Sequence, residues 1–302
     1  MNHAIRTEQL SKRFHRIEAV RNLDLAVPDG GIYALVGPNG AGKTTVIKVL
    51  MNILRASSGR AEVLGVQSSQ VRGEFFTSVG YVSENQQLPE WMGVGSFLSY
   101  LRPFYPTWDR KLEEELVAHL NLPLDQKLRH VSRGTRMKAT LAGALAFHPK
   151  LIVLDEPFTG LDPLVRDELI QALLDRAEEA TIFISSHDLA EIETFASHVG
   201  YLDQGQLRFS EELTHLAERF REVELTFDTP LRLPSQIPPT WMHLSNSAAV
   251  VRFIESRFDS QRTVEEIRST FGEVRNVEMT PMSLRSIFLA FAKAGREPAE
   301  RA

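Results

Sequence analysis

The sequence predicts a large α/β domain followed by a small α+β domain. Short runs of β-branched and apolar residues alternate with helical patterns through the first two-thirds of the chain, as expected for an α/β sheet. The pattern changes after about residue 219, where strand-like runs flank a proline-rich bend. Hydrophobic residues make up 43% of the 302 residues, which is enough for a sizeable core.

The individual elements follow from local periodicity. In the first domain, apolar runs predict buried strands at 31–37, 150–157 and 180–187, a helix at 44–54 and a mostly helical stretch at 92–147. In the second, the patterns predict strands at 222–228, 249–255 and 273–279 and helices at 264–272 and 282–294. We therefore expect a large domain at 1–218, with a mostly helical subdomain at about 88–148, and an accessory domain at 219–302 that ends in a tail at 296–302.

Charge and composition narrow the functional classes. The formal net charge is −5, so the whole chain has no basic footprint for nucleic acid, and no nucleic-acid partner is expected. The sequence contains no cysteine, which excludes disulfides and thiolate chemistry. No apolar run approaches the roughly 20 residues that a spanning helix needs. If the chain acts at a membrane, another polypeptide is expected to cross it.

The stretch "GPNGAGKTT" predicts a phosphate-binding loop between a strand and a helix. Glycines allow the backbone to curl so that its N–H groups face phosphate, and the helix N-terminus favours negative charge. Lys43 is expected to reach the β- and γ-phosphates, and the Thr44 hydroxyl is expected to bind Mg²⁺. The residues predicted to bind nucleotide in this loop are Gly37, Asn39, Gly40, Gly42, Lys43, Thr44 and Thr45.

Acidic and histidine side chains follow two of the other predicted strands. Asp155 ends "LIVLD", where a carboxylate beside a phosphate loop can hold Mg²⁺. Glu156 is the candidate general base for the attacking water. His187 ends the next apolar strand and is a candidate to contact the γ-phosphate. Lys43, Glu156 and His187 form the predicted catalytic set.

Together with further motifs, this order of landmarks resembles the nucleotide-binding subunits of ATP-binding cassette (ABC) transporters. Phe14 matches the family's adenine-stacking aromatic, with Val20 beside it, and 37–45 matches the Walker A loop. "VGYVSENQQ" matches the Q-loop region, "VSRGT" the signature, "LIVLDEP" Walker B, "TGLD" the D-loop with Asp162, and "SSHD" the switch histidine. The match covers 1–218, and the C-terminal extension resembles tails of exporter-type members.

The resemblance implies a P-loop NTPase that uses ATP and Mg²⁺. Two cassettes meet head to tail, as a homodimer or a heterodimer, and Ser132 and Gly134 of each would contact the ATP bound to the other. Closure would drive a separate transmembrane permease from the cytoplasmic face of the cell membrane, and the tail suggests export. The aromatic-rich stretch at 88–108 contains Trp91, Met92 and Tyr100, for which helical core and permease docking are both open interpretations.

Two positions depart from the family pattern. Arg133 and Thr135 replace glycine and glutamine of the signature. If position 133 needed a positive φ, arginine would be strained by about 1 kcal/mol; otherwise its side chain projects outward or pairs with phosphate. Glu84 occupies the place of the Q-loop glutamine and is a predicted metal ligand beside Thr44 and Asp155. Gln86 or Gln87 is the alternative Q-loop residue.

Two other functional classes share the phosphate loop. A soluble ABC protein acting on ribosomes or nucleic acid is the main alternative, although such proteins usually carry two cassettes or a long coiled coil, and this sequence has one loop and no sustained heptads. A small-molecule P-loop kinase would not need "VSRGT", "TGLD" and "SSHD" in this order.

Overall fold

The structure, a computed structural model, describes residues 2–234 and 236–294. By its contacts the chain divides into two compact units, 1–210 and 211–302. This division lies eight residues before the predicted boundary at 218/219, because helix α7 (Leu213–Arg219) belongs to the second unit. The tail predicted at 296–302 lies outside the described residues.

Two sheets build the first unit. A six-stranded sheet has the order β10-β9-β3-β8-β7-β6, and β9, β3, β8, β7 and β6 run parallel. Its strands are β3 (Ile32–Val36), β6 (Val79–Ser83), β7 (Leu151–Asp155), β8 (Thr181–Ser186), β9 (His198–Asp203) and β10 (Gln206–Glu212). A four-stranded antiparallel sheet has the order β2-β1-β4-β5, with β1 (His3–Phe14), β2 (Ile17–Pro28), β4 (Ser58–Val63) and β5 (Val66–Gln67).

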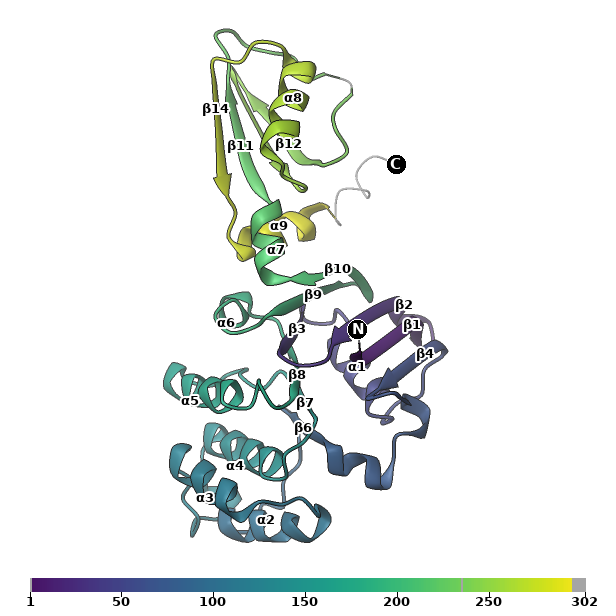
Figure 1. Cartoon of the computed structure of the whole chain (residues 1–302), viewed down its shortest axis with the longest axis vertical. Coiled ribbons are helices and arrows are strands. Elements are labelled where there is room, and N and C mark those ends of the chain that lie inside the picture. The colour runs from purple at the N-terminus through teal and green to yellow at the C-terminus, as the bar shows by residue number, and fades with distance from the viewer. Residues whose placement is uncertain (1, 235, 295–302) are drawn as a thin grey trace. The chain divides into compact units, whose positions relative to one another are not determined.

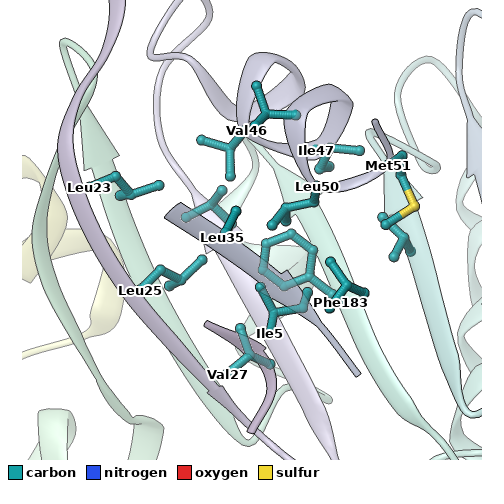
Figure 2. Packing of buried hydrophobic residues seen from close by; sticks show 14 of the residues in the cluster. Ile5, Leu23, Leu25, Val27, Leu35, Val46, Ile47, Leu50, Met51 and Phe183 are labelled. Carbon is teal, nitrogen blue, oxygen red and sulfur yellow. The ribbon is translucent and has the colours of Figure 1, made fainter. Parts of the chain in front are cut away.

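Helix α1 (Lys43–Leu50) lies between these sheets, and its apolar face explains why (Figures 1 and 2). Val46, Ile47 and Leu50 are fully buried against Leu35 and Phe183 of the parallel sheet. The helix is shorter than the predicted 44–54, because Asn52 has a left-handed backbone (φ 54°) and the amides of residues 53 and 54 both bond to the carbonyl of residue 48. The apolar pattern continues there although the helix has ended.

The remaining helices of the first unit cover the other side of the parallel sheet and its β6 edge (Figure 1). They are α2 (Val94–Leu101), α3 (Arg110–His119), α4 (Arg133–Leu145), α5 (Pro163–Leu174) and α6 (Leu189–Ile192). The 3₁₀ segments are Ser68–Gln70, Gly73–Ser78, Arg102–Phe104 and Leu128–His130. Ten residues of α4 are buried, since this helix packs on β6 as well as on α2, α3 and α5. The predicted helical subdomain at about 88–148 contains α2, α3 and α4.

The second unit contains a four-stranded antiparallel sheet with the order β12-β13-β11-β14. Its elements are β11 (Arg221–Thr226), β12 (Trp241–Ser247), β13 (Val250–Glu255), β14 (Asn276–Pro281), α7, α8 (Ser260–Phe271) and α9 (Leu284–Ala294). Trp241, which stacks on Phe253, anchors a separate small core. Gly272, with φ 77°, ends α8 as the sequence predicted. Strand β12 was not predicted.

The central core gives a testable stability difference. We expect Leu35→Ala to lower the free energy of unfolding of the first unit by about 2–5 kcal/mol, since Leu35 is fully buried and its loss leaves a cavity. The matched control is Leu164→Ala, because Leu164 is 70% exposed and should cost little. Urea unfolding of both variants measures the difference, and equal effects would contradict this assignment of the core.

Candidate functional site

The phosphate loop connects β3 to α1 at the carboxyl ends of the parallel strands, the usual place for ligands in such sheets. Its glycines are needed for two different reasons. A Cβ on Gly37 would lie 2.0 Å from the carbonyl oxygen of Leu202, so only glycine fits beside β9. Gly42 caps α1 with φ 109°, and a Cβ there would lie 2.4 Å from the carbonyl oxygen of Ala19. The loop is therefore held against β9 and β2.

Lys43 is buried in this loop, with 5% of its side chain exposed. Its ammonium donates to the carbonyl oxygens of Gly37 at 2.7 Å and Pro38 at 3.2 Å. It also pairs with Glu156, with 3.0 Å between Nζ and Oε1. The structure thus brings together the two predicted catalytic residues that lie 113 positions apart in the sequence. A phosphate that enters the loop would compete with the Glu156 carboxylate for this ammonium.

Thr44 and Asp155 also meet, as the metal prediction requires. The Thr44 hydroxyl donates to Asp155 Oδ1 at 2.9 Å, and Ser185 donates to the same oxygen at 2.8 Å. Burial raises the pKa of Asp155, with the hydrogen bonds from Ser185 and Thr44 acting in the opposite direction. A hydroxyl and a carboxylate are the hard oxygen donors that Mg²⁺ prefers, so these two residues fit the ion.

Glu156 sits directly after β7 with a left-handed backbone, φ 53°. Its amide donates to the Ser185 hydroxyl at 3.0 Å, which fixes this unusual conformation. Its carboxylate contacts His187, with 2.7 Å between Oε2 and Nδ1, and accepts from the Thr159 hydroxyl at 3.1 Å. Burial acts to raise the pKa of Glu156, but the hydrogen bond with His187 and the charge of Lys43 outweigh it and lower the pKa.

The adjacent carboxylates therefore have pKa values shifted in opposite directions, raised for Asp155 and lowered for Glu156. Asp155 accepts hydrogen bonds from two hydroxyl groups, whereas Glu156 faces the Lys43 ammonium and the His187 ring. Ser185 and Thr159 were not predicted as site residues. The serine could have been found from its place beside the switch histidine in "SSHD", since strand-end hydroxyls commonly support such carboxylates.

The predicted adenine contacts have mixed surroundings. Phe14, at the end of β1, is 38% exposed, and the Lys12 ammonium lies 4.9 Å from its ring centroid. An adenine ring would have to stack on the other face or displace this cation. Val20 is fully buried in the core cluster, so its side chain packs inside the first unit and not against a ligand.

The remaining predicted residues of the phosphate loop differ in exposure. Asn39 and Gly40 are exposed at the tip of the loop, and Thr45 is half-buried on α1.

The signature residues lie on other elements. Ser132 caps α4, with its hydroxyl accepting from the Thr135 amide at 3.1 Å. Gly134 is buried where α4 approaches α5, since a Cβ there would lie 2.9 Å from Cγ1 of Val165. Asp162 caps α5 by accepting from the Val165 amide at 3.1 Å. Figure 1 shows α4 and α5 on the opposite side of the parallel sheet from α1. These residues are therefore built away from Lys43 and Thr44.

The two departures from the family pattern lie in contact. Arg133 is the first residue of α4 and has a helical backbone, so the strained alternative for this position does not apply. Its guanidinium donates to the Glu84 carboxylate at 2.5 Å. The Glu84 amide donates to the carbonyl oxygen of Asp155, but the side chain that we predicted as a metal ligand is bonded to this arginine. In the part of the chain that the structure describes, no group of three or more acidic or histidine residues could hold a metal ion.

Comparisons with known proteins identify the family to which this chain is similar. The ABC transporter family model matches residues 20–159. A bacitracin transport ATP-binding protein of Enterococcus faecalis is 30% identical, over 90% of this chain and 89% of that protein. A daunorubicin/doxorubicin resistance ATP-binding protein of Streptomyces peucetius is 29% identical, over 95% of this chain and 92% of that protein. Both alignments extend into the second unit. A solved ATP-binding subunit of an ABC transporter superposes with a TM-score of 0.65 at 25% identity, over 71% of this chain and 92% of that one.

The Thr44–Asp155 pair gives a prediction about the metal. We expect Thr44→Val to lower ATP turnover about 10- to 100-fold and to raise the Mg²⁺ concentration needed for half-maximal rate, because the hydroxyl is lost with little change in shape. Thr44→Ser keeps the hydroxyl and is the matched control, expected to stay near the parent. Turnover measured across a Mg²⁺ titration tests this expectation. An unchanged Mg²⁺ requirement in Thr44→Val would contradict the assignment of Thr44 as a metal ligand.

A phosphate loop, a buried carboxylate pair and a strand-end histidine meet at one edge of the parallel sheet, and the loop and both carboxylates lie within residues 20–159, which the family model matches. The fold, the ordered motifs and the alignments to whole relatives all lead to one family. The chain belongs to the ABC transporter ATP-binding proteins, and it is an ATPase that acts in ATP-driven transport.

Proposed function

We propose that this chain powers a separate membrane permease, most directly for export, by closing with a second cassette over ATP and Mg²⁺. One observation supports this proposal above the others. The residues that would act on bound ATP are joined around Lys43 and Glu156, whereas Ser132 and Gly134 are held on the other side of the sheet. The first group needs a second chain to supply the second group.

The hydrolysis step follows from the charges around Glu156. The phosphates would lie at the N-terminus of α1, where the backbone amides and Lys43 neutralise their charge. Thr44 and Asp155 would hold Mg²⁺, which would supply positive charge against the phosphates. The Glu156 carboxylate, released from Lys43 by the phosphates, would orient the attacking water and accept its proton. His187 lies against the same carboxylate and is placed to contact the γ-phosphate.

A permease partner is supported by what the chain itself provides. None of the helices in the described part of the chain combines the length and apolar character that crossing a bilayer requires. The helical subdomain presents Trp91 and Tyr100, which are 68% and 52% exposed, together with Phe104. Exposed aromatic groups of this size favour an interaction surface over core. We place the chain on the cytoplasmic face of the cell membrane, with these residues toward the permease.

The export direction, which the C-terminal extension suggested, is further supported by the names of two relatives. One similar protein is named for resistance to daunorubicin and doxorubicin, and another for bacitracin transport. Resistance to a toxic compound is most simply obtained by removing it from the cell. The alignments to these proteins include most of the accessory unit, so the likeness is not confined to the phosphate loop and its neighbours.

The mass of Glu156→Gln in solution, with and without ATP, tests closure. Because the amide cannot accept the proton, ATP should stay bound, and we expect an ATP-dependent shift from monomer to dimer. Lys43→Ala added to this variant is the control that should stay monomeric, since it lacks the ammonium for the phosphates.

The alternative outcomes separate the possible partners. A variant that binds ATP yet stays monomeric would contradict closure between two copies and would favour a different cassette as partner. A variant that dimerises equally well without ATP would contradict the sandwich itself.

A further inference from the structure

The two positions that depart from the family pattern are in direct contact. Glu84 follows β6 and Arg133 begins α4, and 49 residues separate them in the sequence. Their side chains meet with 2.5 Å between Arg133 Nη2 and Glu84 Oε1. Glu84 places a carboxylate where the family pattern has the neutral amide of glutamine. Arg133 places a cation where the pattern has glycine. Each change adds a charge that the other neutralises.

The local electrostatics explain why Arg133 needs this partner. The amides of a helix N-terminus carry partial positive charge, so cations are unfavourable there and acids are preferred. The first turn of α4 contains no acid, and Arg133 and Arg136 lie within its first four residues. Both arginines are paired with acids of the segment between β6 and α2: Arg133 with Glu84, and Arg136 with Glu90 at 3.2 Å. Carboxylates from the segment after β6 thus replace the missing first-turn acid.

The Arg133 guanidinium also reaches a third motif. A Cβ built on Gly160 would lie 3.2 Å from Arg133 Nη1, so the side chain passes over the backbone of the "TGLD" loop. Gly160 has φ 68°, which favours glycine. Asp162 of the same loop caps α5. A cleft of about 800 Å³ lies beside this arrangement, between the segment at 83–90 and the first two turns of α4.

We propose that Glu84 is a positioning residue for the signature: its carboxylate holds the Arg133 guanidinium over Gly160 and thereby fixes the N-terminal turn of α4 relative to the loop before α5. This inference rests on the proposed function, in which that turn faces the ATP of a second cassette. The pair acts on the ATP in trans, because Arg133 and Ser132 lie away from the Lys43 site of their own chain. The Glu84 carboxylate serves this pair and not the metal.

A double-mutant cycle on the full chain tests the pair. The variants are Glu84→Gln, Arg133→Gln, both together, and the charge swap Glu84→Arg with Arg133→Glu. We expect each single variant to lower turnover about 3- to 10-fold, the double to be no worse than the weaker single, and the swap to recover part of the loss. ATP affinity of the monomer should stay within about twofold, since binding in cis uses other residues. Glu115→Gln breaks an exposed pair on α3 and is the control that should leave turnover unchanged.

Two results would overturn the proposal. Additive losses in the two single variants, with no recovery by the charge swap, would show that the residues do not act as a pair. A raised Mg²⁺ requirement in Glu84→Gln, together with parent-like turnover in Arg133→Gln, would show that Glu84 serves the metal instead.

A failure of the Glu84–Arg133 pairing can be distinguished from a failure of the proposed function. All measurements use the isolated chain, so a failure to stimulate or bind a permease would contradict the proposed function and leave the cycle readable. If ATP turnover by the isolated chain is too slow to measure, thermal unfolding of the same variants measures the coupling between Glu84 and Arg133. The swap must then recover the melting temperature that the single variants lose, and additive shifts would overturn the pairing.

Discussion

The Lys43 ammonium lies at the carboxyl ends of the parallel strands, bonded to the Gly37 carbonyl and paired with the Glu156 carboxylate. This buried charge needs compensation, because an isolated ammonium out of water is very costly. The compensation comes from groups that must themselves be positioned by β3, β7 and β8. The close approach of Gly37 to β9, the Ser185 contacts and the conformation of Glu156 all serve to place negative or polar groups around this one cation.

Cations compensated by carboxylates also lie at the start of α4. There a helix N-terminus carries two arginines, and carboxylates from a neighbouring segment neutralise them. At Lys43, the phosphates of a nucleotide could replace the carboxylate in the same chain. At Arg133, the neighbouring groups belong to loops that face a second cassette in the proposed dimer. In the proposed dimer, one chain would therefore contribute two half-sites, and in each of them a carboxylate pairs with the cation.

The parts of this molecule that sequence predicts well are those whose information is local. The phosphate loop, the strand before it and the acids after "LIVLD" follow from spacing within a few residues. The antiparallel sheet of the first unit was not predicted. Bulges interrupt its strands β1 and β2, and Gln9 and Asn22 have left-handed backbones, so the side chains of these strands do not alternate regularly. Strand β12 was missed because most of it is half-buried or exposed. The contact between Glu84 and Arg133 could not be inferred, since neither residue carries a local signal for a partner 49 positions away.

The backbone of Glu156 has a consequence for how this enzyme could be improved or degraded by mutation. A left-handed conformation costs a residue with a side chain about 1 kcal/mol, and glycine adopts it freely. Replacing Glu156 by glycine would relieve this strain, but it would also remove the carboxylate that pairs with the buried Lys43 ammonium. Because losing one partner of a buried ion pair is more costly than about 1 kcal/mol of backbone strain, the pair with Lys43 keeps a strained glutamate at a position where the backbone alone favours glycine.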